Sequence, residues 1–156
     1  MHIKEKVEAG IKEAMKSKDQ ERLSALRMIK ADLLLKEKET GRLDDAAAEQ
    51  ALQKMFKKYK KAKEEYESLG KHDEARRYER DLQIIEQFMS APMMEEGQIK
   101  LELQRLVEEM QPAGPQDFGK IMKSFMAGHK NVEGKLVSSL LKEILDKKEK
   151  AGPNLQ

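Results

Sequence analysis

The residues of this chain that could do chemistry are mainly lysines, and the densest group lies in one short stretch. The segment KMFKKYKKAK, residues 54–63, holds six lysines and no acidic residue. On a helix its apolar residues would form a packed seam, and Lys57, Lys60 and Lys61 would lie on the opposite side, in solvent. A dense lysine face neutralises phosphates and gives binding that weakens with salt. A solvated helix face that binds nothing is the competing interpretation, because several glutamates follow one turn later.

The patterns that mark catalytic and metal sites are missing from the sequence. The three histidines, His2, His72 and His129, lie far apart and lack a metal-ligand spacing such as His-x-x-x-His. No serine sits in a Gly-x-Ser-x-Gly turn and no glycine-rich phosphate loop is present. The absence of cysteine excludes disulfides and thiolate chemistry. We therefore predict no catalytic residue, no metal and no cofactor.

Charge and composition indicate a helical protein whose positive charge is concentrated in its first part. Charged and hydrophobic residues each make up 38% of the 156 residues, and the net charge is +2. Residues 1–63 hold 17 Lys and Arg against 11 Asp and Glu, so an electropositive face should lie there. No apolar run approaches the roughly 18 residues of a membrane span, and the N-terminus is too charged for a signal peptide. These features predict a cytoplasmic protein with no membrane segment.

Helical periodicity and capping residues predict four helices in residues 1–90. Asp19 and Asp44 are suitable N-caps, Gly41 suits a left-handed helix end, and Gly70 ends the third helix. The third helix is expected to pack through a narrow seam that steps by four and three, at Met55, Tyr59, Ala62, Tyr66 and Leu69. With short loops between them, these helices are predicted to form an antiparallel bundle, the N-terminal subdomain.

The stretch SAPMMEEG predicts a domain boundary, because Pro92 cannot continue a helix interior. After it we expect a helix over residues 96–110 and then two helices punctuated by glycines. The all-α fold would therefore be completed by a small three-helix C-terminal subdomain, residues 91–150. Residues 151–156 are predicted to be a flexible tail.

Three glycines interrupt the last two helices, and each has a steric explanation. Gly128 is expected to end its helix in the left-handed conformation. Gly119, in a first helical turn, would let a neighbouring helix approach closely, and Gly134 would open the last helix. On this interpretation the three glycines are structural residues of a tight helical hairpin.

The same hairpin carries a family resemblance. The pattern GKIMKSFMAG…VEGKLVSSLLKEIL resembles the C-terminal signature of the GatB/YqeY family, and LSALRMIKADLLLKE and YESLGKHDEARRYERDLQIIEQFM resemble two of its N-terminal segments. The likeness extends over about residues 3–146 and is greatest to the free-standing YqeY-like proteins. It implies a helical N-terminal subdomain joined to a three-helix C-terminal one, like the tail of the B subunit of the tRNA-dependent amidotransferase. That tail contacts tRNA while other domains do the chemistry.

The resemblance favours a non-catalytic tRNA-binding accessory module, working with tRNA and with an aminoacyl-tRNA synthetase or an amidotransferase. Two alternatives stay open. One is a protein-interaction module with an adaptable groove of Met93, Met94, Met122 and Met126. The other is an amidotransferase-like carbon–nitrogen ligase that uses glutamine as amido donor. The candidate nucleic-acid-binding residues are Lys54, Lys57, Lys58, Lys60, Lys61, Lys120, Lys123, Lys130 and Lys135.

Overall fold

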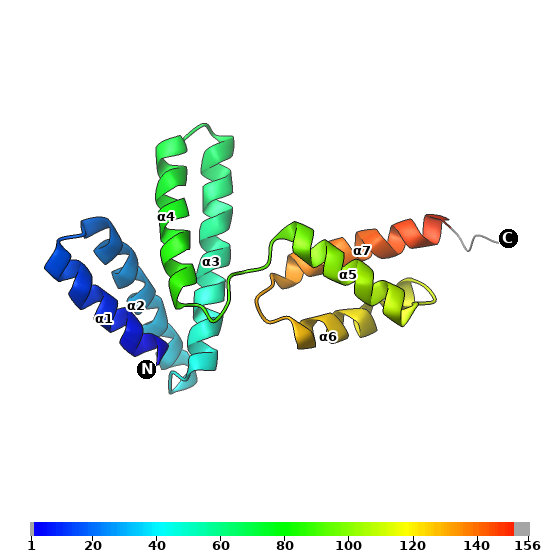
Figure 1. Ribbon diagram of the computed structural model, residues 1–156, viewed down its shortest axis with the longest axis horizontal. Coiled ribbons are helices and arrows are strands. Elements are labelled where there is room, and N and C mark those ends of the chain that lie inside the picture. Colours follow the sequence, from blue (N-terminus) through cyan, green and yellow to red (C-terminus); the bar gives the residue numbers. More distant parts are fainter. Residues whose placement is uncertain (1, 152–156) are drawn as a thin grey trace. The chain divides into compact units, whose positions relative to one another are not determined.

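The computed structural model describes residues 2–151, and within them every regular element is a helix (Figure 1). The predicted all-α fold is confirmed. The elements are α1 (Ile3–Ser17), α2 (Gln20–Thr40), α3 (Asp45–Ser68), α4 (His72–Phe88), α5 (Glu96–Met110), η1 (Pro115–Asp117), α6 (Phe118–Gly128) and α7 (Gly134–Ala151).

Contacts divide the chain into two compact units, the first ending at Pro92 and the second beginning at Met93. That these units are independently folding domains stays a prediction. Of the expected tail, residues 151–156, Ala151 is instead the last residue of α7, and the other five lie outside the described residues.

The N-terminal unit is built from two helical hairpins, α1–α2 and α3–α4, with α2 in contact with the other three helices. Its core is aliphatic. The side chains that are at most 1% exposed come from all four helices and include Val7, Leu26, Ile29, Leu33, Leu52 and Ile85. Burial of such side chains, worth about 1.5–3 kcal/mol each, holds the two hairpins together.

The predicted caps and glycine stops define the helix ends of this unit. The Asp19 carboxylate accepts from Arg22 N at 3.1 Å, and the Asp44 carboxylate accepts from Ala47 N at 2.8 Å. Gly41 adopts φ +82° after α2, a left-handed conformation that glycine tolerates best, so its predicted role is confirmed. Polar caps and left-handed stops thus set the short loops that turn each helix back on its predecessor.

The outer end of the α3–α4 hairpin, with its connecting turn, extends past α1 and α2 (Figure 1). We call residues 56–81, which follow Met55, the last buried residue of α3, the arm. The predicted seam of α3 is confirmed at Met55, Tyr59, Ala62 and Tyr66 and is wrong at Leu69. Tyr59, Ala62 and Tyr66 are half-buried against α4, but Leu69 is 68% exposed, because α3 ends at Ser68 and Leu69 lies in the turn. The arm is therefore a two-helix projection, and at its base Arg80 of α4 stays in contact with the start of α2 through an ion pair with Glu21.

The C-terminal unit is a three-helix core formed by α5, α6 and α7. Ile99, Leu103, Ile121, Phe125 and Leu141 are each at most 1% exposed. The methionines of the groove hypothesis mostly serve this core. Met94, Met122 and Met126 are half-buried and pack against it. Met93 is half-buried as well, and the groove stays a prediction.

The steric explanation is wrong for Gly119 and Gly128, whereas Gly134 begins α7 as expected. In the described chain, positive φ among glycines occurs at Gly41 and Gly70 and not in the hairpin. A Cβ built on Gly119, Gly128 or Gly134 would meet no described atom within 4 Å. No left-handed turn and no close helix approach therefore requires a glycine at these three positions.

His129 performs the capping role that had been expected of Gly128. Its Nδ1–H donates to the Phe125 carbonyl at 3.0 Å, and its ring stacks on the Phe125 ring with centroids 4.1 Å apart and planes at 12°. A side-chain donor to one of the last carbonyls satisfies the helix end without a left-handed residue. Gly128 still ends α6, in an ordinary conformation.

Candidate nucleic-acid interface

Four of the predicted lysines form one stripe along the outer side of α3. Lys54, Lys57, Lys58 and Lys61 follow the i, i+3, i+4, i+7 spacing that places residues on one helix face. We call these four residues the lysine stripe. It spans about 10 Å along the helix axis at 1.5 Å per residue.

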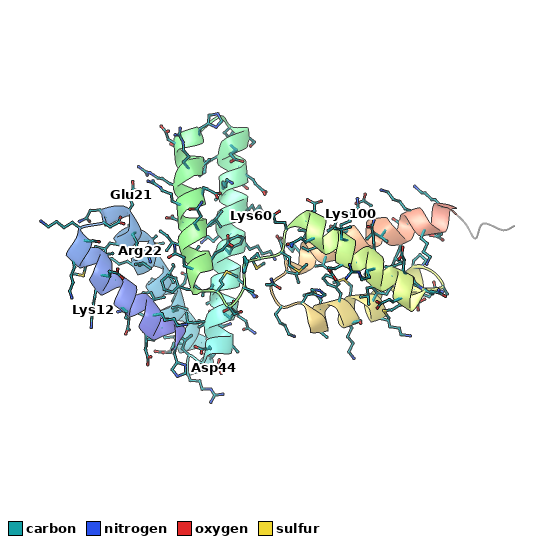
Figure 2. The ribbon with its side chains drawn as sticks, in the orientation of Figure 1. Lys12, Glu21, Arg22, Asp44, Lys60 and Lys100 are labelled. Atoms are coloured by element: carbon teal, nitrogen blue, oxygen red, sulfur yellow. The ribbon has the colours of Figure 1, made fainter. Side chains whose placement is uncertain are left out.

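Exposure differs among these lysines in a way that the sequence did not predict. Lys54, Lys58 and Lys61 are exposed, but Lys57 and Lys60 are half-buried. The expectation that both would lie fully in solvent is corrected. Lys60, labelled in Figure 2, does not follow the spacing of the stripe and lies on a flank of α3.

The exposed lysines of the stripe are electrostatically available. Among residues 2–151, Lys54, Lys58 and Lys61 form no ion pair within 4 Å. Their neighbour Lys63 is occupied. Its ammonium lies 2.6 Å from a Glu79 carboxylate oxygen and 3.8 Å from one of Glu67. The hydrogen bond that Lys63 donates to Glu79 raises the pKa of Lys63, so this lysine holds the arm together and is not part of the interface.

Three tyrosines hold the two helices of the arm in place. Tyr78 on α4 stacks on Tyr66 with ring centroids 5.6 Å apart, and it meets Tyr59 edge-on at 5.4 Å. Burial raises the pKa of Tyr59 to about 12. These rings are engaged with each other, so the interface offers lysine charge without an aromatic platform for stacked bases.

The remaining predicted lysines lie in the C-terminal unit. Lys120 and Lys123 are exposed on α6, on the side away from the buried Ile121 and Phe125, and Lys135 is exposed in the first turn of α7. Within the part of the chain that the structure describes, these three form no ion pair. Lys130 is exposed in the loop between α6 and α7. The lysines of the hairpin therefore form a second basic group, in a different unit from the lysine stripe.

Sequence reasoning missed two arginines of α4 and one of α2. Arg22, Arg77 and Arg80 line a cleft of about 470 Å³ between the start of α2 and α4, where Figure 2 labels Glu21 and Arg22. Three acidic residues line the same cleft, namely Asp19, Glu21 and Asp81. The signal was present as the basic pair in EARRYER, but its proximity to α2 depends on the tertiary fold.

Most of the cleft's charge is already used within the fold. Arg80 forms an ion pair with Glu21, and Arg22 Nη1 donates to Gln87 Oε1 at 2.9 Å. Burial raises the pKa of Asp81. With equal numbers of cationic and acidic side chains around it, this cleft has less attraction for phosphate than the lysine stripe.

Other kinds of site find little support in the fold. In residues 2–151 no group of three or more His, Cys, Asp or Glu side chains is arranged to hold a metal ion. No helix of the described chain is both long and apolar enough to cross a membrane.

Comparison with known proteins places the chain in a family. A comparison with curated proteins finds no significant match. The family model described as "Yqey-like protein" matches residues 4–145, which include all seven α-helices in whole or in large part. Because that match extends over most of the 156 residues, the chain belongs to the family of YqeY-like proteins.

Proposed function

We propose that this protein is a non-catalytic tRNA-binding accessory module. Membership of the YqeY-like family, whose helical domain resembles the tail of the amidotransferase B subunit, supports the proposal. The observation that carries it is the lysine stripe, with three exposed lysines that form no ion pair among the described residues.

The chemistry of the stripe favours phosphate over bases. A lysine ammonium is a compact point charge on a flexible stem, so it neutralises phosphates without selecting a base edge. The stripe lies on α3, at the base of the arm, and its lysines Lys54, Lys58 and Lys61 are exposed, so a nucleic-acid backbone can approach them without displacing other elements. Affinity would therefore come mainly from counterion release, and specificity for one tRNA from a partner protein such as a synthetase or an amidotransferase.

The test is binding of total tRNA to the purified protein at about 50 mM salt, where each phosphate contact is worth about tenfold in affinity. We expect the triple variant Lys54→Glu/Lys58→Glu/Lys61→Glu to weaken binding by at least a hundredfold. The matched control carries the same change of charge at three exposed lysines of α1, Lys6, Lys12 and Lys16.

The control variant should retain binding within a few fold of the wild-type protein, because only long-range charge is altered. Equal weakening by both variants would mean that net charge rather than the stripe attracts tRNA. An unchanged affinity in the stripe variant would refute the proposal.

A further inference from the structure

The lysine stripe lies on a surface without exposed aromatic rings. In residues 2–151 every Phe and Tyr side chain is buried or half-buried. Tyr78 contacts Tyr59 and Tyr66 within the arm, and Phe56, which lies among the lysines in the sequence, is half-buried. Proteins that bind single-stranded nucleic acid usually stack its bases on exposed aromatic rings. The stripe therefore lacks the main feature that holds unpaired bases.

Arginine, on which bases also stack, is absent from α3. Two arginines of α4, Arg77 and Arg80, line the cleft between α2 and α4, and no lysine of the stripe lines that cleft. The stripe is thus a row of lysines on the outer side of one helix, a convex surface rather than a groove. Such a row suits the outside of a nucleic-acid duplex better than it encloses a single strand.

The spacing of the three exposed lysines matches the backbone of one duplex strand. From Lys54 to Lys58 the helix rises about 6 Å, and from Lys58 to Lys61 it rises about 4.5 Å. One strand of a duplex advances about 3.4 Å along its axis for each phosphate. Over about 10 Å the strand therefore presents three successive phosphates, and the flexible lysine stems can absorb the remaining difference.

One acidic residue ends this row of positive charge. Glu65 follows Lys61 by four residues, so it lies on the same side of α3. It is exposed and forms no ion pair among the described residues. Before Lys54 the same side carries Gln50, which is uncharged. A carboxylate repels phosphate, so contacts that begin near Lys54 should end at Lys61.

The other acidic side chains of α3 near the stripe disturb the row less. The Glu49 carboxylate accepts from Ser90 N at 2.9 and 3.1 Å, and Glu67 pairs with Lys63. Glu64 lies to the side of the row, about a quarter turn around the helix. Three exposed lysines against the single carboxylate of Glu65 leave the row positive.

We propose that the lysine stripe binds the paired stems of tRNA, through the backbone of one strand, rather than its unpaired loops. This inference rests on the proposed function and specifies the part of tRNA that the stripe contacts. A duplex carries the denser charge, so each neutralised phosphate contributes about 0.9 to the slope of log affinity against log salt, compared with about 0.7 on a single strand.

The test compares two RNA probes by fluorescence anisotropy with the full chain. One is a duplex of about twelve base pairs, and the other is an oligouridine with the same number of phosphates, which does not pair with itself. Through three contacts the two salt slopes should differ by about 0.6. If the affinities converge near 1 M salt, the duplex should bind about sixfold more tightly at about 50 mM.

Variants then locate the contact. The variant Lys54→Glu/Lys58→Glu/Lys61→Glu should lose the preference for the duplex. Glu65→Gln should tighten duplex binding by about two- to threefold, because it removes the repulsion at the end of the row. The matched control Glu13→Gln, at an exposed glutamate of α1 without an ion-pair partner among the described residues, should leave the affinity unchanged.

Several outcomes would overturn the inference. If oligouridine binds as tightly as the duplex while tRNA still binds, the stripe does not select stems, although the proposed function stands. A duplex preference that survives in the triple variant would assign it to another basic group. Equal tightening by Glu65→Gln and Glu13→Gln would mean that net charge, not the row, attracts the duplex. No binding of tRNA or of either probe would refute the proposed function as well.

Discussion

Removing the ring of Tyr78 should loosen the arm that carries the lysine stripe. Tyr78 lies at the centre of the aromatic cluster, stacked on Tyr66 and edge-on to Tyr59. On α3 no described residue beyond Met55 is fully buried, so these half-buried rings supply much of the packing between the outer parts of α3 and α4. Tyr78→Ala deletes both ring contacts at once.

The expected loss follows from the two contacts and the burial. Truncating a fully buried aromatic residue costs about 3–5 kcal/mol, a figure that already includes its ring contacts of about 0.5–1.5 kcal/mol each. Because Tyr78 is half-buried and keeps some contact with solvent, we expect Tyr78→Ala to lower the free energy of unfolding by about 2–3 kcal/mol.

Urea unfolding and native-state hydrogen exchange measure this loss and locate it. Amides of the arm should lose protection, and amides of α5, α6 and α7 should keep theirs, because those helices belong to the other unit. The control Tyr78→Phe retains the ring and should change stability by less than about 0.5 kcal/mol. A loss below about 0.5 kcal/mol for Tyr78→Ala would refute the role of the cluster.

Three further predictions concern single residues. Gly119→Ala should raise the free energy of unfolding by about 0.5–1 kcal/mol, because the added Cβ has room and the φ of Gly119 is ordinary. Gly70→Ala should lower the free energy of unfolding, because Gly70 has φ +74°. Thermal unfolding distinguishes the two signs. Lys63→Met should cost about 0.5–1 kcal/mol at pH 7. The hydrogen bond from Lys63 lowers the pKa of Glu79 below its ordinary 4.5. The destabilisation caused by Lys63→Met should therefore fade as pH falls through this lowered pKa, and urea unfolding at pH 7 and near pH 3 tests this. Asp44→Ala removes the cap of α3 and should cost about 1 kcal/mol by urea unfolding; no loss would mean that this cap is dispensable.

Local sequence signals predicted the helices well, because their causes are local. Asp44 caps α3 through a backbone amide three residues away, and Gly41 has the left-handed conformation that was predicted for the end of α2. The bounds of α5 were predicted without error. The seam of α3 was extended too far, because periodicity alone does not show that the helix ends one residue before Leu69.

Errors arose where the deciding contact involves a particular side chain. The end of α6 was attributed to the backbone of Gly128, but the ring of His129 caps Phe125 instead. A lone histidine in a loop gives no sequence signal for that role. Met122 was assigned to a groove from its residue type, and only the fold shows that part of its side chain packs on the C-terminal core.

The candidate site was predictable in its residue types more than in its geometry. The density of lysine in 54–63 identified the right helix. Periodicity separated the outer face from the seam, but it did not show that Lys63 is occupied by Glu79 or that Lys57 is half-buried. Which lysines are available depends on α4, and α4 comes against α3 only in the folded hairpin.

The salt dependence of tRNA affinity tests the central claim most directly. The three exposed lysines of the stripe, Lys54, Lys58 and Lys61, should each contribute about 0.7–0.9 to the slope of log affinity against log salt. Affinity should therefore fall by about 20- to 40-fold between 50 and 200 mM salt through these contacts alone. In the triple glutamate variant the slope should become shallower by about 2–3. A slope near zero in the wild-type protein, or one that the variant leaves unchanged, would contradict the account.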